Sequence, residues 1–336
     1  MYQEFYLLNK KPFDLAPDPG MVFMSEAHQE ATAIFRYGVL TRKGFLLLTG
    51  QVGTGKTTLL QFLAKSLDNH VHLCMIANPT LEVREFLYLL AAKFGIEGFD
   101  GNKARFLINF SAFLKECREK GEQVLLVIDE AHVLPIDILE EIRLLSNQEY
   151  QEYGVLSIFL VGQPELRERL NTERLLPLKQ RIGIQYHLQP FTAAETADYI
   201  AFRLRRAGSH AHLFTTEAIE LIHARCNGTP RLLNVACDHA LITGYAENKR
   251  VIDAKTAREC LNELGITNQT PATGDGWKKT GQALLAARPV ILAAGLLIAL
   301  LVGAVLYQSS HPAWISAMYE KTTSTGVILW EKFIRR

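Results

Sequence analysis

The sequence predicts an α/β fold with a three-layer, mostly parallel sheet, followed by a small all-α domain and one C-terminal transmembrane helix. Three observations support this prediction. Short apolar runs alternate with amphipathic stretches up to about residue 190, strand patterns stop near residue 192, and one long uncharged run lies near the end of the 336-residue chain. Strands that alternate with helices form parallel sheets, because each return to the sheet needs a crossover helix.

The expected strands share a short apolar run that ends at polar, glycine or proline positions, and they cover residues 45–49, 71–76, 124–128, 156–161 and 184–188. Amphipathic spacing predicts helices between them at residues 58–67, 83–94, 104–120, 136–146 and 165–170. It predicts further helices at residues 193–207, 216–225, 230–245 and 254–264. We therefore expect an α/β domain at 1–190 and an all-α domain at 191–265.

The strongest chemical signal follows the first expected strand directly. The sequence there is Gly50-Gln51-Val52-Gly53-Thr54-Gly55-Lys56-Thr57-Thr58, which matches G-x-x-x-x-G-K-[ST]. In this pattern the glycines let backbone N–H groups face a phosphate, and the lysine reaches the β- and γ-phosphates. The hydroxyl of Thr57 can ligate Mg²⁺. The motif predicts a P-loop NTPase in which these residues bind ATP with Mg²⁺.

Two acids follow a second strand, at residues 124–128. Asp129 and Glu130 come directly after this apolar run. The carboxyl end of a central parallel strand lies beside the phosphate loop, where open α/β sheets bind ligands. Asp129 is therefore expected to hold Mg²⁺ through water, and Glu130 to polarise the attacking water. A solvated helix start is the alternative for the acids taken alone, but their pairing favours a hydrolase over a nucleotide switch.

The composition excludes several classes of protein. The chain is 48% apolar and 21% charged, which is ordinary for a globular protein and unlike a disordered one. Its net charge of +1 provides no argument for a nucleic-acid partner, and none is expected. Five cysteines without a C-x-x-C pair argue against a disulfide framework or a zinc ribbon. The arginines at positions 203, 205 and 206 are expected to form a solvated basic edge.

Residues 290–307 are uncharged and, as a helix, reach about 27 Å, close to the thickness of a bilayer core. A polar linker at 266–289 precedes this predicted span, and a short tail at 308–336 follows it. Lys278, Lys279 and Arg288 lie just before the span, so the positive-inside rule places the N-terminal part in the cytoplasm and the tail in the periplasm.

With these motifs, residues 1 to about 265 resemble the AAA+ ATPases, and within them the ExeA-like membrane-assembly ATPases of the general secretion pathway A type. The residues that carry the resemblance are Tyr2, Phe5, Tyr6, Pro12-Phe13, Pro17-Asp18-Pro19, His28, Gly162-Gln163-Pro164-Glu165-Leu166 and Gly228-Thr229-Pro230-Arg231 with Asn234. The family's secretion members carry a peptidoglycan-binding domain after the membrane helix, and we expect none here.

The resemblance implies roles for three further residues. Gln163 occupies the sensor-1 position, which contacts the γ-phosphate or the attacking water, although most relatives have Asn or Thr there. Arg231 opens a helix of the all-α domain, the family's lid, and matches the sensor-2 arginine. Arg181 falls where the family places an arginine finger that reaches a neighbouring subunit, with Arg174 as the competing candidate. A finger in trans implies a homo-oligomer, such as a ring or an arc.

The resemblance therefore implies an ATPase anchored in a bacterial inner membrane. It is expected to drive assembly or regulation of an envelope system (secretion, pilus or exopolysaccharide export) together with inner-membrane envelope proteins. One alternative is a DNA-handling ATPase similar to transposition helper proteins, which share the core and the opening signature. Another is a nucleotide-dependent scaffold with incidental turnover.

Overall fold

The computed structural model describes residues 1–16, 18–68, 70–77, 81–150 and 154–266. The chain divides into two compact units, Met1–Gln269 and Thr270–Arg336, and every described residue belongs to the first. Within these ranges, no helix combines the length and the apolar character needed to cross a bilayer. The predicted span at 290–307 and the predicted tail lie outside the described residues.

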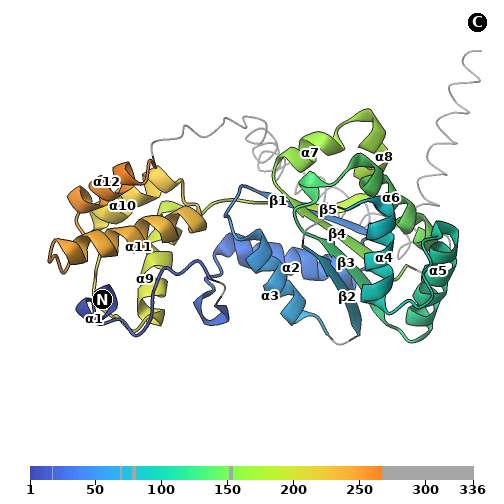
Figure 1. Cartoon of the computed structure of the whole chain (residues 1–336), viewed down its shortest axis with the longest axis horizontal. Coiled ribbons are helices and arrows are strands. Elements are labelled where there is room, and N and C mark those ends of the chain that lie inside the picture. Colours follow the sequence, from blue (N-terminus) through green and yellow to red (C-terminus); the bar gives the residue numbers. More distant parts are fainter. Residues whose placement is uncertain (17, 69, 78–80, 151–153, 267–336) are drawn as a thin grey trace, which may run out of the picture. The chain divides into compact units, whose positions relative to one another are not determined.

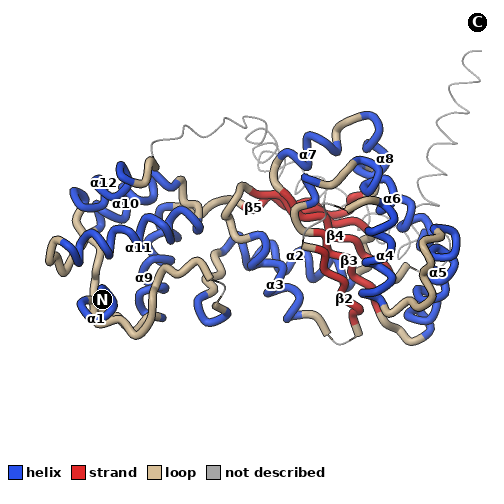
Figure 2. The backbone as a smooth tube through the Cα atoms, viewed as in Figure 1, coloured by secondary structure: helices blue, strands red, loops and turns tan. Residues whose placement is uncertain are grey.

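A parallel sheet forms the centre of the first part of the chain (Figures 1 and 2). Its strands, as far as the structure describes the chain, are β1 (Phe45–Gly50), β2 (Val71–Ile76), β3 (Gln123–Ile128), β4 (Leu156–Gly162) and β5 (Ile182–Leu188). They lie in the order β2-β3-β4-β1-β5, and each neighbouring pair is parallel. This arrangement confirms the predicted α/β fold and brings the carboxyl ends of β1, β3 and β4 to one edge.

Helices pack against both faces of the sheet (Figure 1). Their bounds are α2 (Glu26–Leu40), α3 (Lys56–Ser66), α4 (Val83–Phe94), α5 (Lys103–Glu119), α6 (Ile136–Tyr150), α7 (Glu165–Leu170) and α8 (Leu176–Lys179). Successive side chains of β1 point to opposite faces, as in any strand. Leu46 shares one buried core with Phe35 of α2, whereas Leu47 shares another with Phe110 of α5. The expected three layers are therefore present.

A third core, made of helices, begins after β5. The helices α9 (Ala193–Arg206), α10 (Thr216–Cys226), α11 (Pro230–Ala246) and α12 (Ala254–Glu263) cover the segments that helical spacing predicts. A capping box starts α9, in which the Thr192 side chain accepts from the N–H of Glu195 and the Glu195 carboxylate accepts from the N–H of Thr192. Apolar residues of these helices, including Leu233 and Ile222, are fully buried against one another.

The N-terminal segment completes this helical core. Tyr2 in the short helix α1 (Tyr2–Phe5), together with Tyr6, Leu8 and Phe13, is buried in the same cluster as α9–α12. The Tyr2 hydroxyl donates to the Asp238 carboxylate at 2.5 Å. Residues at the start of the chain therefore pack with helices that begin about 190 residues later, although the sequence assigned them to the α/β domain.

Arg203 corrects the predicted basic edge. It is 7% exposed rather than solvated. Its guanidinium donates to the carbonyl oxygens of Pro12 at 2.5 Å and Asp14 at 2.9 Å. A buried charge is tolerated only where its donors are paired, and the carbonyls of the N-terminal segment provide that pairing. Arg203 therefore fastens this segment to α9.

The connection between β5 and the helical core passes close to Gly228. Phe191 donates its N–H to the Gly228 carbonyl at 2.9 Å. Gly228 has φ of +63°, and a Cβ on it would lie 1.9 Å from the Phe191 carbonyl oxygen. Because both contacting groups are backbone, no side chain can move aside to admit a methyl group.

We therefore expect Gly228→Ala to lower the free energy of unfolding by more than about 3 kcal/mol, from the left-handed conformation and the backbone clash together. The matched control is Gly121→Ala, where φ is +73° but a Cβ would meet nothing within 4 Å. The control should cost only about 1 kcal/mol. Denaturant titration of both variants measures the difference, and equal losses would contradict the assigned clash.

Candidate phosphate-binding site

The predicted phosphate loop joins the end of β1 to the start of α3. Gly55 immediately precedes the helix with φ of +98°, a conformation that residues with a side chain rarely adopt. A Cβ on Gly55 would lie 2.8 Å from Nε2 of His28. Both the left-handed turn and the imidazole therefore require glycine at this position, and the first turn of α3 presents its free N–H groups beside the loop.

His28 contacts the phosphate loop at Thr54. It lies on α2, it is 3% exposed, and its Nε2 lies 3.1 Å from the Thr54 carbonyl oxygen. A carbonyl only accepts, so Nε2 carries the proton and Nδ1 accepts from the Ser25 hydroxyl at 2.8 Å. Burial lowers the pKa of the His28 imidazole, which keeps it neutral. The sequence indicated His28 only as part of a signature, and this supporting role was missed.

Lys56 is a buried cation at the first position of α3. It is 5% exposed, and its ammonium donates to the carbonyl oxygens of Gly50 at 2.8 Å and Gln51 at 3.0 Å. Burial lowers the pKa of Lys56, while the carboxylates of Glu130 and Asp129 act against that shift. An ammonium held on two carbonyls can exchange those bonds for phosphate oxygens, which are stronger partners because they are charged.

Thr57 and Asp129 meet at the carboxyl ends of β1 and β3, as predicted. The Thr57 hydroxyl donates to Oδ2 of Asp129 at 2.7 Å, and the other oxygen of this carboxylate accepts from the N–H of Glu130 at 2.9 Å. Asp129 is 4% exposed. A hydroxyl and a carboxylate are the hard oxygen ligands that Mg²⁺ prefers, so this pair fits a magnesium ion shared with phosphate oxygens.

A chain of side chains joins Glu130 to Gln163. The Gln163 amide nitrogen lies 2.8 Å from Nε2 of His132, and Nδ1 of His132 lies 3.3 Å from a Glu130 carboxylate oxygen. With the amide in this orientation Nε2 accepts, which places the ring proton on Nδ1. Among the described residues this buried Nδ1 makes no hydrogen bond, although Glu130 lies near it. Arg169 donates to the backbone carbonyl of His132 and so holds the short 3₁₀ turn at Ala131–Val133.

His132 is therefore a site residue that sequence reasoning missed. It follows Glu130 by two positions in the sequence. That spacing alone does not predict that the two side chains lie close together. The signal that the sequence offered was the position of Gln163 at the end of β4, the strand that lies next to β3.

The structure also brings Arg231 to the loop. Its backbone N–H donates to the Gly53 carbonyl at 3.3 Å, and Arg231 opens α11 just after Pro230. The side chain is exposed beside the loop. The helical core and the phosphate loop thus touch at the residue that the resemblance selected for a phosphate contact.

Arg181 and Arg174 lie elsewhere, against the neighbourhood of α6. Arg181 donates to the Arg143 carbonyl at 3.0 Å and to the Ser146 hydroxyl at 2.6 Å. Arg174 forms an exposed ion pair with Asp137, at 2.5 Å. These contacts place both arginines at α6, away from residues 50–58 of the same chain.

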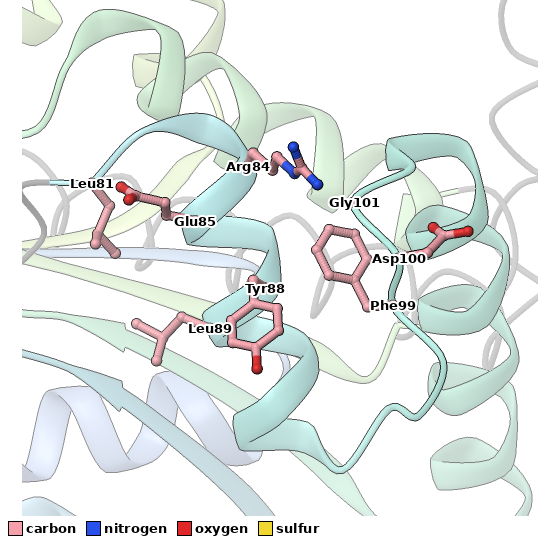
Figure 3. A pocket seen from close by; sticks show the side chains of 8 residues that line it. All are labelled: Leu81, Arg84, Glu85, Tyr88, Leu89, Phe99, Asp100 and Gly101. Atoms are coloured by element: carbon pink, nitrogen blue, oxygen red, sulfur yellow. The ribbon is translucent and has the colours of Figure 1, made fainter.

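A groove of about 520 Å³ lies apart from these residues, between α4 and the segment that leads into α5 (Figure 3). Tyr88 of α4 faces Phe99 across it, with the two ring centroids 6.2 Å apart. None of the residues that line it is a predicted site residue. The groove is therefore separate from the phosphate loop.

Comparison with known proteins agrees with this geometry. Residues 39–170 match the family model described as an AAA domain. The chain is similar to general secretion pathway protein A of Aeromonas hydrophila, with 37% identity over 262 residues. That match covers 75% of this chain and 46% of the relative, so the chain spans about half the length of that relative.

Two further similarities concern proteins whose names mention DNA. The Mu-like prophage FluMu DNA transposition protein B of Haemophilus influenzae is 32% identical over 121 residues, which covers 36% of this chain and 38% of that protein. The solved structure of the Drosophila ORC bound to DNA has a TM-score of 0.60 at 15% identity, and covers 79% of this chain and 66% of that one. At such low identity the second similarity shows the fold alone.

Proposed function

Since the chain is an AAA ATPase similar to general secretion pathway protein A, we propose that it binds ATP with Mg²⁺ at residues 50–58 and hydrolyses it to drive an assembly in the bacterial envelope. The observation that carries the proposal is the meeting of the buried Lys56, Thr57 and Asp129 at the carboxyl edge of the sheet. A loop that matches the phosphate-binding pattern ends at this point.

The chain's own residues then divide the chemistry. Lys56 binds the β- and γ-phosphate oxygens, and the N–H groups of the loop and of the start of α3 orient them. Thr57 and Asp129 are the residues that would hold Mg²⁺, which supplies charge neutralisation between the phosphates when bound. Glu130 accepts a proton from the attacking water. Its carboxylate is 44% exposed, so water can reach it.

His132 gives Glu130 a defined position before attack. Its Nδ1 lies 3.3 Å from the carboxylate, close enough for a small side-chain rotation to form a hydrogen bond that is not made in this structure, while Gln163 donates to the opposite ring nitrogen. A γ-phosphate within reach of Gln163 would compete with His132 for the same amide, so phosphate binding would change what holds the imidazole beside Glu130. His132 is a positioning residue in this scheme, since it acts through Glu130.

The remaining parts of the proposal follow the family. The helical region α9–α12 acts as a lid, and Arg231 reaches the phosphates from it, supported by its backbone bond to Gly53. Arg181 acts as the arginine finger in a neighbouring subunit, which requires a homo-oligomer. The ordinary net charge of +1 gives no sign of a nucleic-acid partner.

We further propose that residues 290–307 anchor the ATPase in the inner membrane, with the catalytic part in the cytoplasm and the tail in the periplasm. The support is the length and lack of charge of this segment and the basic residues before it. ATP turnover would then act on envelope proteins in the membrane, in a secretion, pilus or exopolysaccharide-export system.

The competing function is a DNA-handling ATPase. Its support is the similarity to a DNA transposition protein over 121 residues, which is shorter than the 262-residue similarity to the secretion protein. Added duplex DNA distinguishes the two functions, because a DNA-handling ATPase is expected to bind it at physiological salt and to hydrolyse ATP faster in its presence.

Lys56→Ala should weaken ATP binding by about 10–100-fold, since a charge-assisted contact to phosphate is lost. Lys65→Ala, which changes an exposed lysine on the same helix, is the matched control and should bind ATP normally.

Glu130→Gln should still bind ATP while hydrolysis falls by about 10²–10⁴-fold. Fluorescent-nucleotide titration and phosphate release measure these effects, and full turnover in Glu130→Gln would remove the assigned base.

His132→Ala should lower kcat by about 10²-fold, since a base displaced by about 1 Å loses that much. ATP affinity should be unchanged. His132→Asn keeps an N–H donor near the position of Nδ1 and should recover part of the rate, whereas His132→Leu should not. Equal rates in the Asn and Leu variants would show that His132 acts through packing alone.

Arg181→Ala should bind ATP without turning it over. Mixed with Lys56→Ala protein, it should regain activity, because each variant supplies the group that the other lacks at a shared site. Arg174→Ala is the matched comparison, and rescue in its mixture alone would transfer the finger to Arg174. Absence of rescue in both mixtures at every ratio would overturn a finger acting in trans.

The full-length chain should stay in the membrane pellet after alkaline washing. Leu297→Arg combined with Leu300→Arg should release it, since each arginine near the centre of a span costs about 2.5–3.5 kcal/mol. Lys278→Ala, outside the span, is the control. Recovery of the unaltered chain in the supernatant would contradict the proposed anchor.

A further inference from the structure

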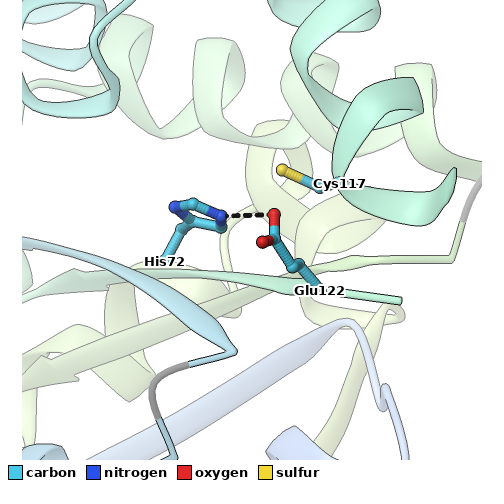
Figure 4. A group of neighbouring side chains, drawn as sticks. All are labelled: His72, Cys117 and Glu122. Carbon is cyan, nitrogen blue, oxygen red and sulfur yellow. Dashed lines mark hydrogen bonds and ion pairs between the residues drawn. The ribbon is translucent and has the colours of Figure 1, made fainter. Parts of the chain in front are cut away.

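Three metal-binding side-chain types meet at the amino end of the sheet, away from the phosphate loop. His72 is the second residue of β2, Cys117 lies in the last turn of α5, and Glu122 directly precedes β3. One ligand atom from each, the imidazole nitrogen, the sulfur and a carboxylate oxygen, lies within 4.8 Å of the others. Figure 4 shows the imidazole and the carboxylate pointing at each other, with the sulfur beside them.

The backbone holds these residues in place. The N–H of Glu122 donates to the Cys117 carbonyl at 2.8 Å, which closes the turn between α5 and β3. The N–H of Gln123 donates to the His70 carbonyl at 2.8 Å, which aligns the start of β3 with that of β2. The Phe113 ring packs 5.6 Å from the His72 ring and restricts its orientation. The cluster is therefore built by backbone bonds and packing, independently of the contact between its polar groups.

We propose that His72, Cys117 and Glu122 form a site for a divalent transition metal, best suited to Zn²⁺. An imidazole nitrogen, a thiolate and a carboxylate are all zinc ligands. With zinc–ligand bonds of about 2.0–2.3 Å, ligand atoms in a tetrahedral site lie about 3.3–3.7 Å apart. The present separations run from 2.7 Å between Nε2 of His72 and Oε2 of Glu122 up to 4.8 Å, so small side-chain rotations suffice.

The surroundings favour a cation with one open position. The Lys120 ammonium, the nearest positive side chain in the turn, is already paired with Glu116 at 2.6 Å. His72 is 42% and Glu122 25% exposed, so a water molecule can serve as the fourth ligand. The buried Cys117 would be bound from the inner side. Binding replaces the thiol proton with a zinc–sulfur bond, and the proton passes to solvent.

The site would fasten an edge of the sheet. β2 is the outermost strand on its side of the described sheet, and an ion bound by these three residues connects it to β3 and α5. The existing contact between His72 and Glu122 is a partly exposed hydrogen bond at 2.7 Å, which by itself stabilises the strand edge little. This proposal is independent of ATP hydrolysis, because the metal site lies at the amino ends of the strands and the phosphate loop at their carboxyl ends.

The test uses full-length, untagged protein stripped with a chelator and titrated with Co²⁺. We expect one equivalent to give visible d–d bands and a near-ultraviolet thiolate-to-cobalt band, and Zn²⁺ to displace both. Cys117→Ser should remove the thiolate band, and His72→Gln and Glu122→Gln should lower Co²⁺ affinity by about 10–100-fold.

Two variants serve as matched controls, Cys74→Ser on the same strand and His70→Gln at its start. Both should bind Co²⁺ normally. Zn²⁺ should also raise the melting temperature of the unaltered protein and not that of His72→Gln, whose exposed side chain is tolerant of replacement. Absence of saturable Co²⁺ binding, a thiolate band that survives in Cys117→Ser, or loss of binding in the controls alone would overturn the site.

Discussion

A buried ammonium at the carboxyl edge of a parallel sheet is the constraint on which the site depends. Lys56 is 5% exposed and stays charged only if negative or dipolar groups surround it. Two loop carbonyls contact it directly, and the acids at the end of β3 lie close enough to oppose the effect of burial. The strand order β3-β4-β1 makes this possible, because it brings β3 within reach of the loop that follows β1.

The same edge also receives parts of the chain from outside the sheet. His28 contacts the loop at Thr54, and Arg231 contacts it at Gly53. His28 belongs to α2 beside the sheet, whereas Arg231 lies at the start of α11 in the helical core. The phosphate loop is thus contacted by the α/β part and by the helical core, so a change in the ligand that the loop binds can affect both. A shared contact of this kind is what a nucleotide-driven change of arrangement requires.

Much of the fold was predictable because its signals are local. Buried strands appear as apolar runs, and the loop motif fixes Lys56 and Thr57 relative to the sheet. Asp129 was predictable because it directly follows another buried strand. The helix α2 was missed, although Ser25 caps it and Ala31, Phe35 and Val39 lie at helical spacing on its buried face. The helix contributes to the site because His28 contacts the Thr54 carbonyl oxygen. Local sequence patterns do not predict a contact between residues so far apart.

Other errors have the same origin. Arg203 sits among arginines and looks solvated, but carbonyls almost 190 residues earlier in the chain bind it. His132 has an ordinary place after two acids, and its importance depends on how β4 lies beside β3. Charge and spacing report neighbours in sequence, whereas these roles belong to neighbours in space.

The burial of Tyr2, Tyr6 and Phe13 among α9–α12 has a consequence for biosynthesis. These aromatic residues leave the ribosome about 180 residues before the first of the helices α9–α12, and the final helix of this cluster, which ends at Glu263, emerges later still. While the intervening chain is translated, their apolar side chains stay exposed, although the sheet can already assemble. This segment is therefore made well before the helices it packs against, and it can reach its native place only after they have been made.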